Sequence, residues 1–191
     1  ALESITIPEG WTSLGTSTFA ECANVTKVTF PSTLKEINSG AFTSCSSLKS
    51  IEIPEGVEKV GSYAFYYCEG LESVSLPSTL RTIEDNAFDS CSALNTVDIK
   101  EGLETVGDWV FSGCLALPAV ILPSTLTTLG TNVFYEWTSE QTAAVNMTEE
   151  EFNSKGVFVE TEGSGAWYKD ATPAYKTADN TWLDGMTVTV K

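Results

Sequence analysis

All five cysteines of the chain stand in the same sequence context, three residues after a phenylalanine. Each one follows the previous one by 23 residues: Cys22, Cys45, Cys68, Cys91 and Cys114. Cysteine thiols can pair as disulfides, bind zinc or act as nucleophiles, so this regular series is the first place to look for chemistry. Because five is an odd number, one thiol would be left over in any set of disulfide pairs.

The spacing argues against disulfides and against a metal. If each 23-residue segment forms one coil and the coils stack as parallel strands do, equivalent residues lie about 5 Å apart at Cα and at Cβ. The Cβ atoms of a disulfide, in contrast, lie about 3.8 Å apart. A structural zinc site needs a tetrahedral set of ligands, and the chain has neither a C-x-x-C pair nor a histidine. A small, mildly apolar thiol suits an inward-facing column. We therefore interpret the five cysteines as a structural core ladder and expect no metal and no cofactor.

Other catalytic arrangements are also hard to build from this sequence. The absence of histidine removes the usual general base and every Ser–His or Cys–His pair. Glu52 and Asp98 share a column two coils apart, about 10 Å at Cα, which is near the separation of about 6.5–9.5 Å between the carboxyl groups of inverting glycosidases. A shallow ribbon of strands, however, offers no pocket that excludes water. We predict that the chain is not an enzyme.

The cysteines belong to a longer repeat that must position them. Six 23-residue segments align without gaps, starting at Leu2, Val25, Leu48, Leu71, Leu94 and Leu117. Apolar residues at the first, fourth and sixth places predict a half-buried strand. A proline, which lacks the N–H that a ladder requires, ends this strand in every segment except the fifth, which has Lys100. The segments alternate between P-E-G or K-E-G and P-S-T after the strand, which indicates duplication of a 46-residue unit.

The pattern L-x-x-I-x-I-P followed by L-x-x-I-G-x-x-A-F-x-x-C resembles the BspA-like leucine-rich repeats of bacterial surface proteins. The resemblance covers residues 2 to about 137, and the A-F-x-x-C unit is quite specific to that family. It implies a leucine-rich-repeat solenoid with a parallel β-sheet on the concave side. Trp137 stands where a sixth cysteine would fall, and we expect it to mark the end of the array.

Residues 138–191 follow another pattern. Thr148 with Glu151 three residues later is a capping-box signature for a short helix. Three stretches alternate as strands do: 156–161, 166–169 and 186–191. We predict two parts, a solenoid of residues 1–137 and a small β-rich capping segment of residues 138–191, since repeat arrays need capped ends for solubility. A separate ligand-binding module is the alternative for the second part.

The first candidate binding surface is the concave side of the sheet. The third and fifth places of each strand should point to solvent there. In the first five segments these places hold mostly hydroxyl side chains: Ser4, Thr6, Lys27, Thr29, Ser50, Glu52, Ser73, Ser75, Thr96 and Asp98. Tight interfaces usually carry buried Trp, Tyr or Arg anchors, and this surface has none. We expect at most a weak or multivalent contact here.

The second candidate surface is an aromatic strip. Tyr63 and Trp109 occupy the same repeat position two coils apart, and Tyr66 and Tyr67 stand beside them in the loop Y-A-F-Y-Y-C. If these side chains project outward, they form a strip on the side opposite the proline-ended strands that could contact a partner. The alternative is partial burial along the convex edge.

The charge of the chain limits its partners. Its 26 acidic and 10 basic residues give a net charge of −16, which repels nucleic-acid phosphates and anionic membrane surfaces. No apolar run reaches the length of about 18 residues that spans a bilayer, so we expect no membrane insertion.

The family resemblance implies an extracellular or cell-surface location in a bacterium and a role in adhesion. We predict a non-enzymatic recognition module for a protein or glycan partner; the alternative is a structural spacer in a larger surface protein.

Overall fold

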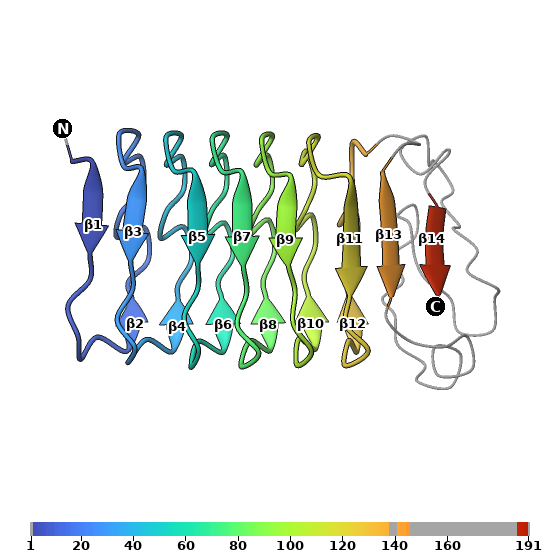
Figure 1. The fold of residues 1–191 in the computed structure, drawn as a ribbon, viewed down its shortest axis with the longest axis horizontal. Helices are drawn as coiled ribbons and strands as arrows, with labels where there is room; N and C mark the ends of the chain where they lie inside the picture. Colours follow the sequence, from blue (N-terminus) through green and yellow to red (C-terminus); the bar gives the residue numbers. More distant parts are fainter. Residues whose placement is uncertain (1, 138–140, 146–186, 191) are drawn as a thin grey trace.

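The computed structural model describes residues 2–137, 141–145 and 187–190. The described part of the chain winds as a solenoid in which each coil advances by one strand along the long axis (Figure 1). Every strand pair in it is parallel, and equivalent residues of neighbouring coils pair at an offset of 23 residues, as Ser50 does with Ser73. The 23-residue period of the sequence is therefore the length of one coil.

One side of the solenoid, called the strand face below, carries the longer strands and corresponds to the predicted concave side. Its strands are β1 (Ser4–Thr6), β3 (Lys27–Thr29), β5 (Ser50–Glu52), β7 (Ser73–Ser75), β9 (Thr96–Asp98), β11 (Ala119–Leu122), β13 (Thr142–Val145) and β14 (Thr187–Val190). Along β1, β3, β5, β7 and β9 the central apolar residue points inward and its two neighbours point outward, as in β5, where Ile51 is buried between exposed Ser50 and Glu52.

The strand face is divided into three sheets, with strand orders β1-β3, β5-β7-β9 and β11-β13-β14. The division before β11 has a cause in the sequence. Within the middle sheet the backbone N–H of Glu72 donates to Lys49 and that of Asn95 donates to Glu72, at 2.8 and 3.0 Å. The next residue of this column is Pro118, which has no N–H to donate to Asn95.

A second sheet lines another side of the coils. Its two-residue strands are β2 (Ser13–Leu14), β4 (Glu36–Ile37), β6 (Lys59–Val60), β8 (Thr82–Ile83), β10 (Thr105–Val106) and β12 (Thr128–Leu129). The second residue of each strand is apolar and buried. These strands were not predicted, because two residues are too few to show the alternation that marks a strand.

The third side of each coil is an arc that contains the F-x-x-C unit and two turns. We define the arc as residues 16–24, 39–47, 62–70, 85–93, 108–116 and 131–137. Each arc has two residues with positive φ, at the same repeat positions in every coil: Ser17, Gly40, Tyr63, Asn86, Trp109 and Asn132 at the first position, and Glu21, Ser44, Tyr67, Ser90, Gly113 and Glu136 at the second.

The core is built from stacked columns of identical or similar side chains. The phenylalanines of the A-F-x-x-C unit form the largest column, in which Phe42, Phe65, Phe88 and Phe111 are fully buried. Neighbouring rings are nearly parallel, with centroids 5.4 Å apart for Phe42 and Phe65 and 5.2 Å apart for Phe65 and Phe88. The spacing of the coils is therefore also the spacing of a stacked aromatic ladder.

The cysteine column lies beside the phenylalanine column. All five thiols are free, four of them are buried, and Cys22 at the first coil is half-buried. Each buried Sγ donates to the backbone carbonyl of the phenylalanine one coil and three residues earlier, as Cys68 does to Phe42 at 3.1 Å. Burial raises the pKa of the Cys91 and Cys114 thiols above their usual range, which keeps them protonated and able to donate. The cysteine is thus a buried hydrogen-bond donor as well as a small core residue.

Trp137 occupies the cysteine position in the sixth coil and, like the cysteines, donates a hydrogen bond to a phenylalanine carbonyl. It is buried, and its Nε1–H donates to the carbonyl of Phe111 at 3.0 Å. The ladder continues beyond it, because β13 pairs with β11 at the same offset, Ala119 with Thr142. That the repeat array itself ends at Trp137 stays a prediction.

Two strands of the predicted capping segment lie in the described part of the chain. β14 falls within the predicted strand 186–191 and pairs with β13, Thr142 with Thr187. The predicted short helix and the predicted strands 156–161 and 166–169 lie outside the described residues.

The 46-residue sequence unit has a structural counterpart in clasps between odd and even coils. Glu55 accepts hydrogen bonds from the backbone N–H and the hydroxyl of Ser78, both at 3.0 Å, and Gly56 N–H donates to the Thr79 hydroxyl at 2.9 Å. The N–H of Ser78 holds the pKa of the Glu55 carboxyl below its usual range. Equivalent clasps join Glu9 to Ser32 and Glu101 to Ser124. The alternation P-E-G and P-S-T therefore encodes a contact between consecutive coils.

Candidate recognition surfaces

The structure places every predicted concave-side residue on the strand face with its side chain at the surface. Six of them surround a shallow hollow of about 270 Å³ whose floor is Ile51 and Val74: Ser50, Glu52, Ser73, Ser75, Thr96 and Asp98. The remaining four, Ser4, Thr6, Lys27 and Thr29, lie on the separate β1–β3 sheet.

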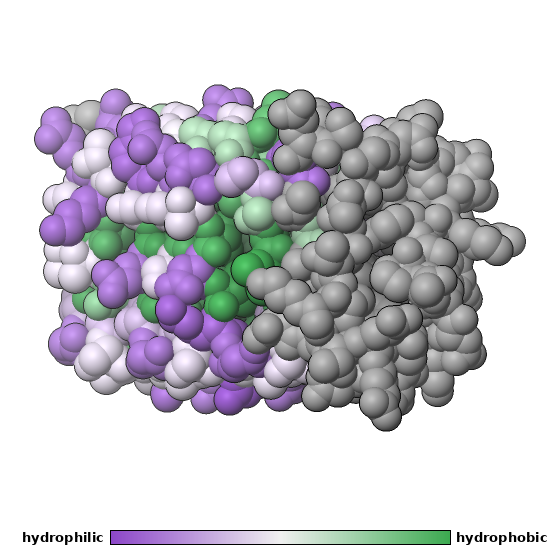
Figure 2. Space-filling view, turned by 45° about the vertical axis from the view of Figure 1, so that its right-hand side comes forward, coloured by the Kyte–Doolittle hydropathy of each residue, from purple (hydrophilic) through white to green (hydrophobic). Residues whose placement is uncertain are grey.

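The hollow offers few groups that could bind a partner tightly. Glu52 and Asp98 stand on opposite sides of Ser75 in one column, and the Asp98 carboxylate is paired with Lys100. No aromatic ring lines the hollow. Figure 2 shows the strand face obliquely, with polar side chains in rows and apolar side chains visible between the rows. Ile121 of β11, an apolar residue of the strand face, is 50 % exposed.

A larger hollow of about 310 Å³ lies at the first coil, lined by Leu2, Ile5, Ile7, Trp11 and Phe19 among others. These residues are the first members of the core columns. The strands of the first coil, β1 and β2, pair with β3 and β4 of the second coil, and no described strand pairs with them on the other side. The hollow is the exposed end of the core and carries no group of convergent polar side chains.

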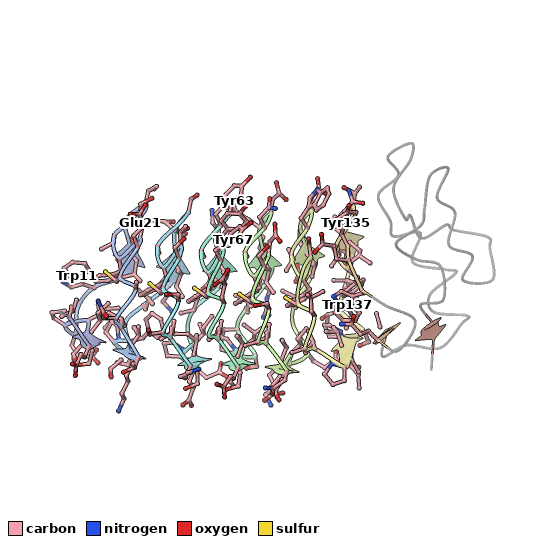
Figure 3. The ribbon with its side chains drawn as sticks, turned by 90° about the horizontal axis from the view of Figure 1, so that it is seen from above. Trp11, Glu21, Tyr63, Tyr67, Tyr135 and Trp137 are labelled. Atoms are coloured by element: carbon pink, nitrogen blue, oxygen red, sulfur yellow. The ribbon has the colours of Figure 1, made fainter. Side chains whose placement is uncertain are left out.

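The four residues of the predicted aromatic strip lie on the arcs, with Tyr63 and Tyr67 exposed and Tyr66 and Trp109 partly buried, and one further aromatic residue lies beside them. We call this set the aromatic ridge and define it as Tyr63, Tyr66, Tyr67, Trp109 and Tyr135. Tyr63 and Tyr67 are 45 % and 43 % exposed. Figure 3 shows Tyr63 and Tyr135 on the side of the solenoid opposite the arrows of the strand face, whereas Trp137 points into the interior.

The ridge consists of two ring clusters. Tyr66 packs edge-on against Tyr63 and Tyr67, with centroids 5.3 and 4.5 Å away. Three coils further along the Tyr66 column, Tyr135 packs against Trp109 at 4.9 Å. Tyr135 was missed in the sequence, although its repeat position, identical to that of Tyr66, was the signal that could have identified it.

Three of these rings are carried by a backbone conformation that disfavours them. Tyr63, Tyr67 and Trp109 have φ angles of 59°, 55° and 59°. Glycine and asparagine occupy this left-handed region most readily, and a bulky residue there costs about 1–3 kcal/mol. The repeat position of Tyr63 and Trp109 holds Asn86 and Asn132 in two other coils. Asparagine, which tolerates this backbone conformation better than tyrosine or tryptophan, therefore fits the same position.

A polar saddle separates the two ring clusters. It consists of Asn86, Asp89 and Ser90 of the fourth coil. The Asp89 carboxylate accepts a hydrogen bond from the Asn86 amide and another from the Ser90 hydroxyl, both at 2.9 Å. Burial raises the pKa of the Tyr66 phenol, with smaller contributions from Tyr67 and the Asp89 charge, so Tyr66 stays neutral beside a negative carboxylate.

Residues 2–137, 141–145 and 187–190 contain no group of three His, Cys, Asp or Glu side chains that could hold a metal ion. In the same ranges no helix has the length and apolar character needed to cross a bilayer.

The fold matches known bacterial proteins. A leucine rich repeat protein from Treponema pallidum is 21 % identical over 74 % of this chain and 73 % of its own, with a TM-score of 0.55. The pneumococcal vaccine antigen PcpA is 24 % identical over 88 % of this chain and 44 % of its own, with a TM-score of 0.57. These similarities establish the leucine-rich-repeat fold and confirm the predicted solenoid with its parallel sheet.

A leucine rich cell surface protein from Faecalibacterium prausnitzii is 21 % identical over 78 % of this chain, with a TM-score of 0.49. The chain spans 56 % of that protein and 44 % of PcpA, so about half of such relatives has no counterpart here. No curated protein sequence matches the chain.

The repeat pattern itself identifies the family. The BspA type leucine rich repeat region matches residues 1–114 and 58–158, with six copies of the repeat. These matches cover most of the chain and include the A-F-x-x-C unit that carried the resemblance. The chain belongs to the BspA type leucine rich repeat family.

Proposed function

We propose that this chain is a non-enzymatic protein-recognition module of a bacterial surface protein and that the aromatic ridge is its main contact surface. One observation carries the proposal: exposed Tyr63 and Tyr67, with half-buried Trp109, are held at left-handed backbone positions that favour asparagine or glycine. Bulky residues in such backbone conformations cluster at functional sites, which favours a functional role for these rings.

Tyrosine and tryptophan are also the side chains that most often anchor protein interfaces. Solenoids present extended surfaces to their partners, and the family gives this chain such a scaffold. The related PcpA is named a vaccine antigen, which supports display of such arrays outside the cell. We extend this location, and a role in adhesion, to the present chain.

We assign the strand face a secondary part in binding. Its outward columns and the hollow between Glu52 and Asp98 offer hydroxyl and carboxylate groups but no aromatic anchor. A contact there contributes weakly or through many repeats at once. We further assign residues 1–137 to the recognition array and residues 138–191 to a capping segment, a division supported by the addition of β13 and β14 to the end of the sheet.

The test is a binding screen of the purified chain against immobilised extracellular-matrix proteins and glycans. A ridge variant, Tyr63→Asn/Tyr67→Ser/Trp109→Asn, gives these positions the residues found in other coils. A strand-face variant, Glu52→Gln/Asp98→Asn, removes the two carboxylates of the hollow. We expect a protein partner whose binding weakens at least about tenfold in the ridge variant, as loss of anchor residues does, and by less than about threefold in the strand-face variant.

Three results would contradict the proposal. Equal binding by the parent and the ridge variant would remove the ridge as the recognition surface. A hit confined to glycans would replace the protein partner by a carbohydrate. No binding to any immobilised protein would favour a structural spacer.

A further inference from the structure

We propose that the partner segment bound by the aromatic ridge is rich in lysine or arginine and that one cationic side chain sits over Asp89, between the two ring clusters. The inference rests on the proposed function, because it requires the ridge to be a recognition surface. It adds the chemical class of the partner, which neither the family nor the related structures specify.

The first support is the segregation of charge around the coil. The arcs contain no lysine or arginine in any of the six coils. They do contain acidic residues: Glu21, Glu69, Asp85, Asp89, Asp108 and Glu136. Five of these, all except Glu21, lie in the third to sixth coils, which also carry the ridge rings. A cationic segment approaching this side meets carboxylates and no like charge.

The second support is where the cations are. The basic residues of the coils (residues 2–137) lie on the strand face and around the second sheet, which is made of the two-residue strands: Lys27, Lys35, Lys49, Lys59, Arg81 and Lys100. Four of them pair with carboxylates there, Lys49 with Glu72, Lys59 with Glu84, Arg81 with Glu104 and Lys100 with Asp98. None of these four ion pairs involves an arc carboxylate. The four paired cations therefore do not neutralise the negative charge of the arcs.

The third support is the geometry of the saddle. Tyr63 and Trp109 are equivalent residues two coils apart, and the coil spacing is near that of the Phe65 and Phe88 rings, 5.2 Å. The gap between the clusters is therefore about 10 Å, and a guanidinium or ammonium group in it lies within about 6 Å of a ring on either side, the range of cation–π attraction. The Asp89 carboxylate of the intervening coil, fixed by Asn86 and Ser90, supplies the opposite charge.

The strand face does not offer the same chemistry. Its hollow has carboxylates but no ring, and Asp98 already has Lys100 as its partner. The combination of rings and unopposed carboxylates is specific to the arcs of the third to sixth coils. A basic partner segment is thus directed to the ridge and not to the sheet.

The test uses labelled peptides of equal length in which lysine or arginine alternates with glycine, and matched peptides with glutamine or glutamate in the cationic positions. Binding to the intact chain is followed by fluorescence anisotropy at low and high salt. The cationic peptides should bind, the glutamate peptide should not, and high salt should weaken binding because it screens exposed charges. Trp109→Asn and Asp89→Asn should each weaken binding about five- to tenfold, the range of a cation–π contact or an exposed charge pair.

Matched controls distinguish the ridge from net charge and from aromatic content. Glu58→Gln removes one negative charge from the short-strand side, and Trp11→Asn removes an exposed tryptophan at the first coil; neither should change binding by more than about twofold, since exposed charges far apart are screened. Equal losses in Asp89→Asn and Glu58→Gln would show a nonspecific charge effect and overturn the inference.

The outcomes also separate this inference from the proposed function. If the glutamine peptide binds as tightly as the lysine peptide, and Trp109→Asn still abolishes binding, the ridge stays a recognition surface and the cationic class is wrong. If the cationic peptides bind the parent and the ridge variants alike, both the inference and the ridge as the binding surface are wrong.

Discussion

Replacement of Phe65 by alanine should lower the free energy of unfolding by about 3–5 kcal/mol. Phe65 is fully buried and stacks between Phe42 and Phe88 at 5.4 and 5.2 Å. Its loss leaves a cavity in the middle of the ladder, and the two neighbouring coils cannot close over it without breaking their own strand pairing. Because each coil contacts only its neighbours, the damage falls at an interface between coils that the whole array needs.

Urea unfolding followed by circular dichroism measures this change, and Phe19→Ala is the matched control. Phe19 has the same repeat position but stands at the end of the column, where it is half-buried and stacks on Phe42 alone. We expect its loss to cost about half as much, in line with the smaller area that it buries. Equal effects of the two variants, or a loss below about 1 kcal/mol for Phe65→Ala, would contradict the stacked-core account.

Replacement of Trp137 by alanine should be similarly costly, about 3–5 kcal/mol, because it removes a large buried side chain. Trp137 packs on Phe134 with centroids 4.7 Å apart and donates its indole N–H to the Phe111 carbonyl. The variant would therefore create a cavity and remove one of the donors to a buried carbonyl.

The matched comparison for Trp137 uses two further variants. Trp11→Ala removes a tryptophan that is 46 % exposed and should cost less than about 1 kcal/mol, as surface substitutions do. Trp137→Cys restores the residue of the other coils and its donor, and should recover part of the loss. A Trp137→Ala variant as stable as the parent would show that the sixth coil does not continue the cysteine column.

Much of the fold could be predicted from the sequence because a repeat states its pattern several times. The 23-residue period, the strand ended by proline and the inward cysteine column each follow from a spacing seen in five or six coils. A single coil would have been ambiguous. The alternation around Ile51, for example, gains its meaning from the same alternation around Val74 in the next coil.

What could not be predicted depends on contacts between coils. The two-residue strands, such as β6, exist because their neighbours pair with them and not because of any local preference. The thiol of Cys68 donates to a carbonyl 26 residues earlier, a partner that composition and spacing do not identify. The clasp of Glu55 and Ser78 was visible as a 46-residue rhythm, but its hydrogen bonds were not.

The candidate surface was only partly predictable for a similar reason. The positions of Tyr63 and Trp109 pointed to a strip, but the left-handed backbone beneath them, the cluster with Tyr135 and the saddle around Asp89 required the structure. Each arc has one left-handed residue two places before its phenylalanine and another two places after it, and the side chains at those positions are exposed or partly buried. The sequence shows which residues stand there, whereas the coil geometry shows that they are displayed.

The measurement that tests the account most directly is the free energy of unfolding of Tyr63→Asn/Tyr67→Ser. These substitutions give the third coil the residues of the fourth, Asn86 and Ser90, at its two left-handed positions. Relief of the backbone strain at position 63, about 1–2 kcal/mol because asparagine tolerates the left-handed region, should offset much of the loss of the two ring contacts, about 0.5–1.5 kcal/mol each. We predict a variant within about 1 kcal/mol of the parent or more stable. A loss of about 3 kcal/mol or more would place these tyrosines in the packed structure and contradict the ridge as a surface kept for recognition.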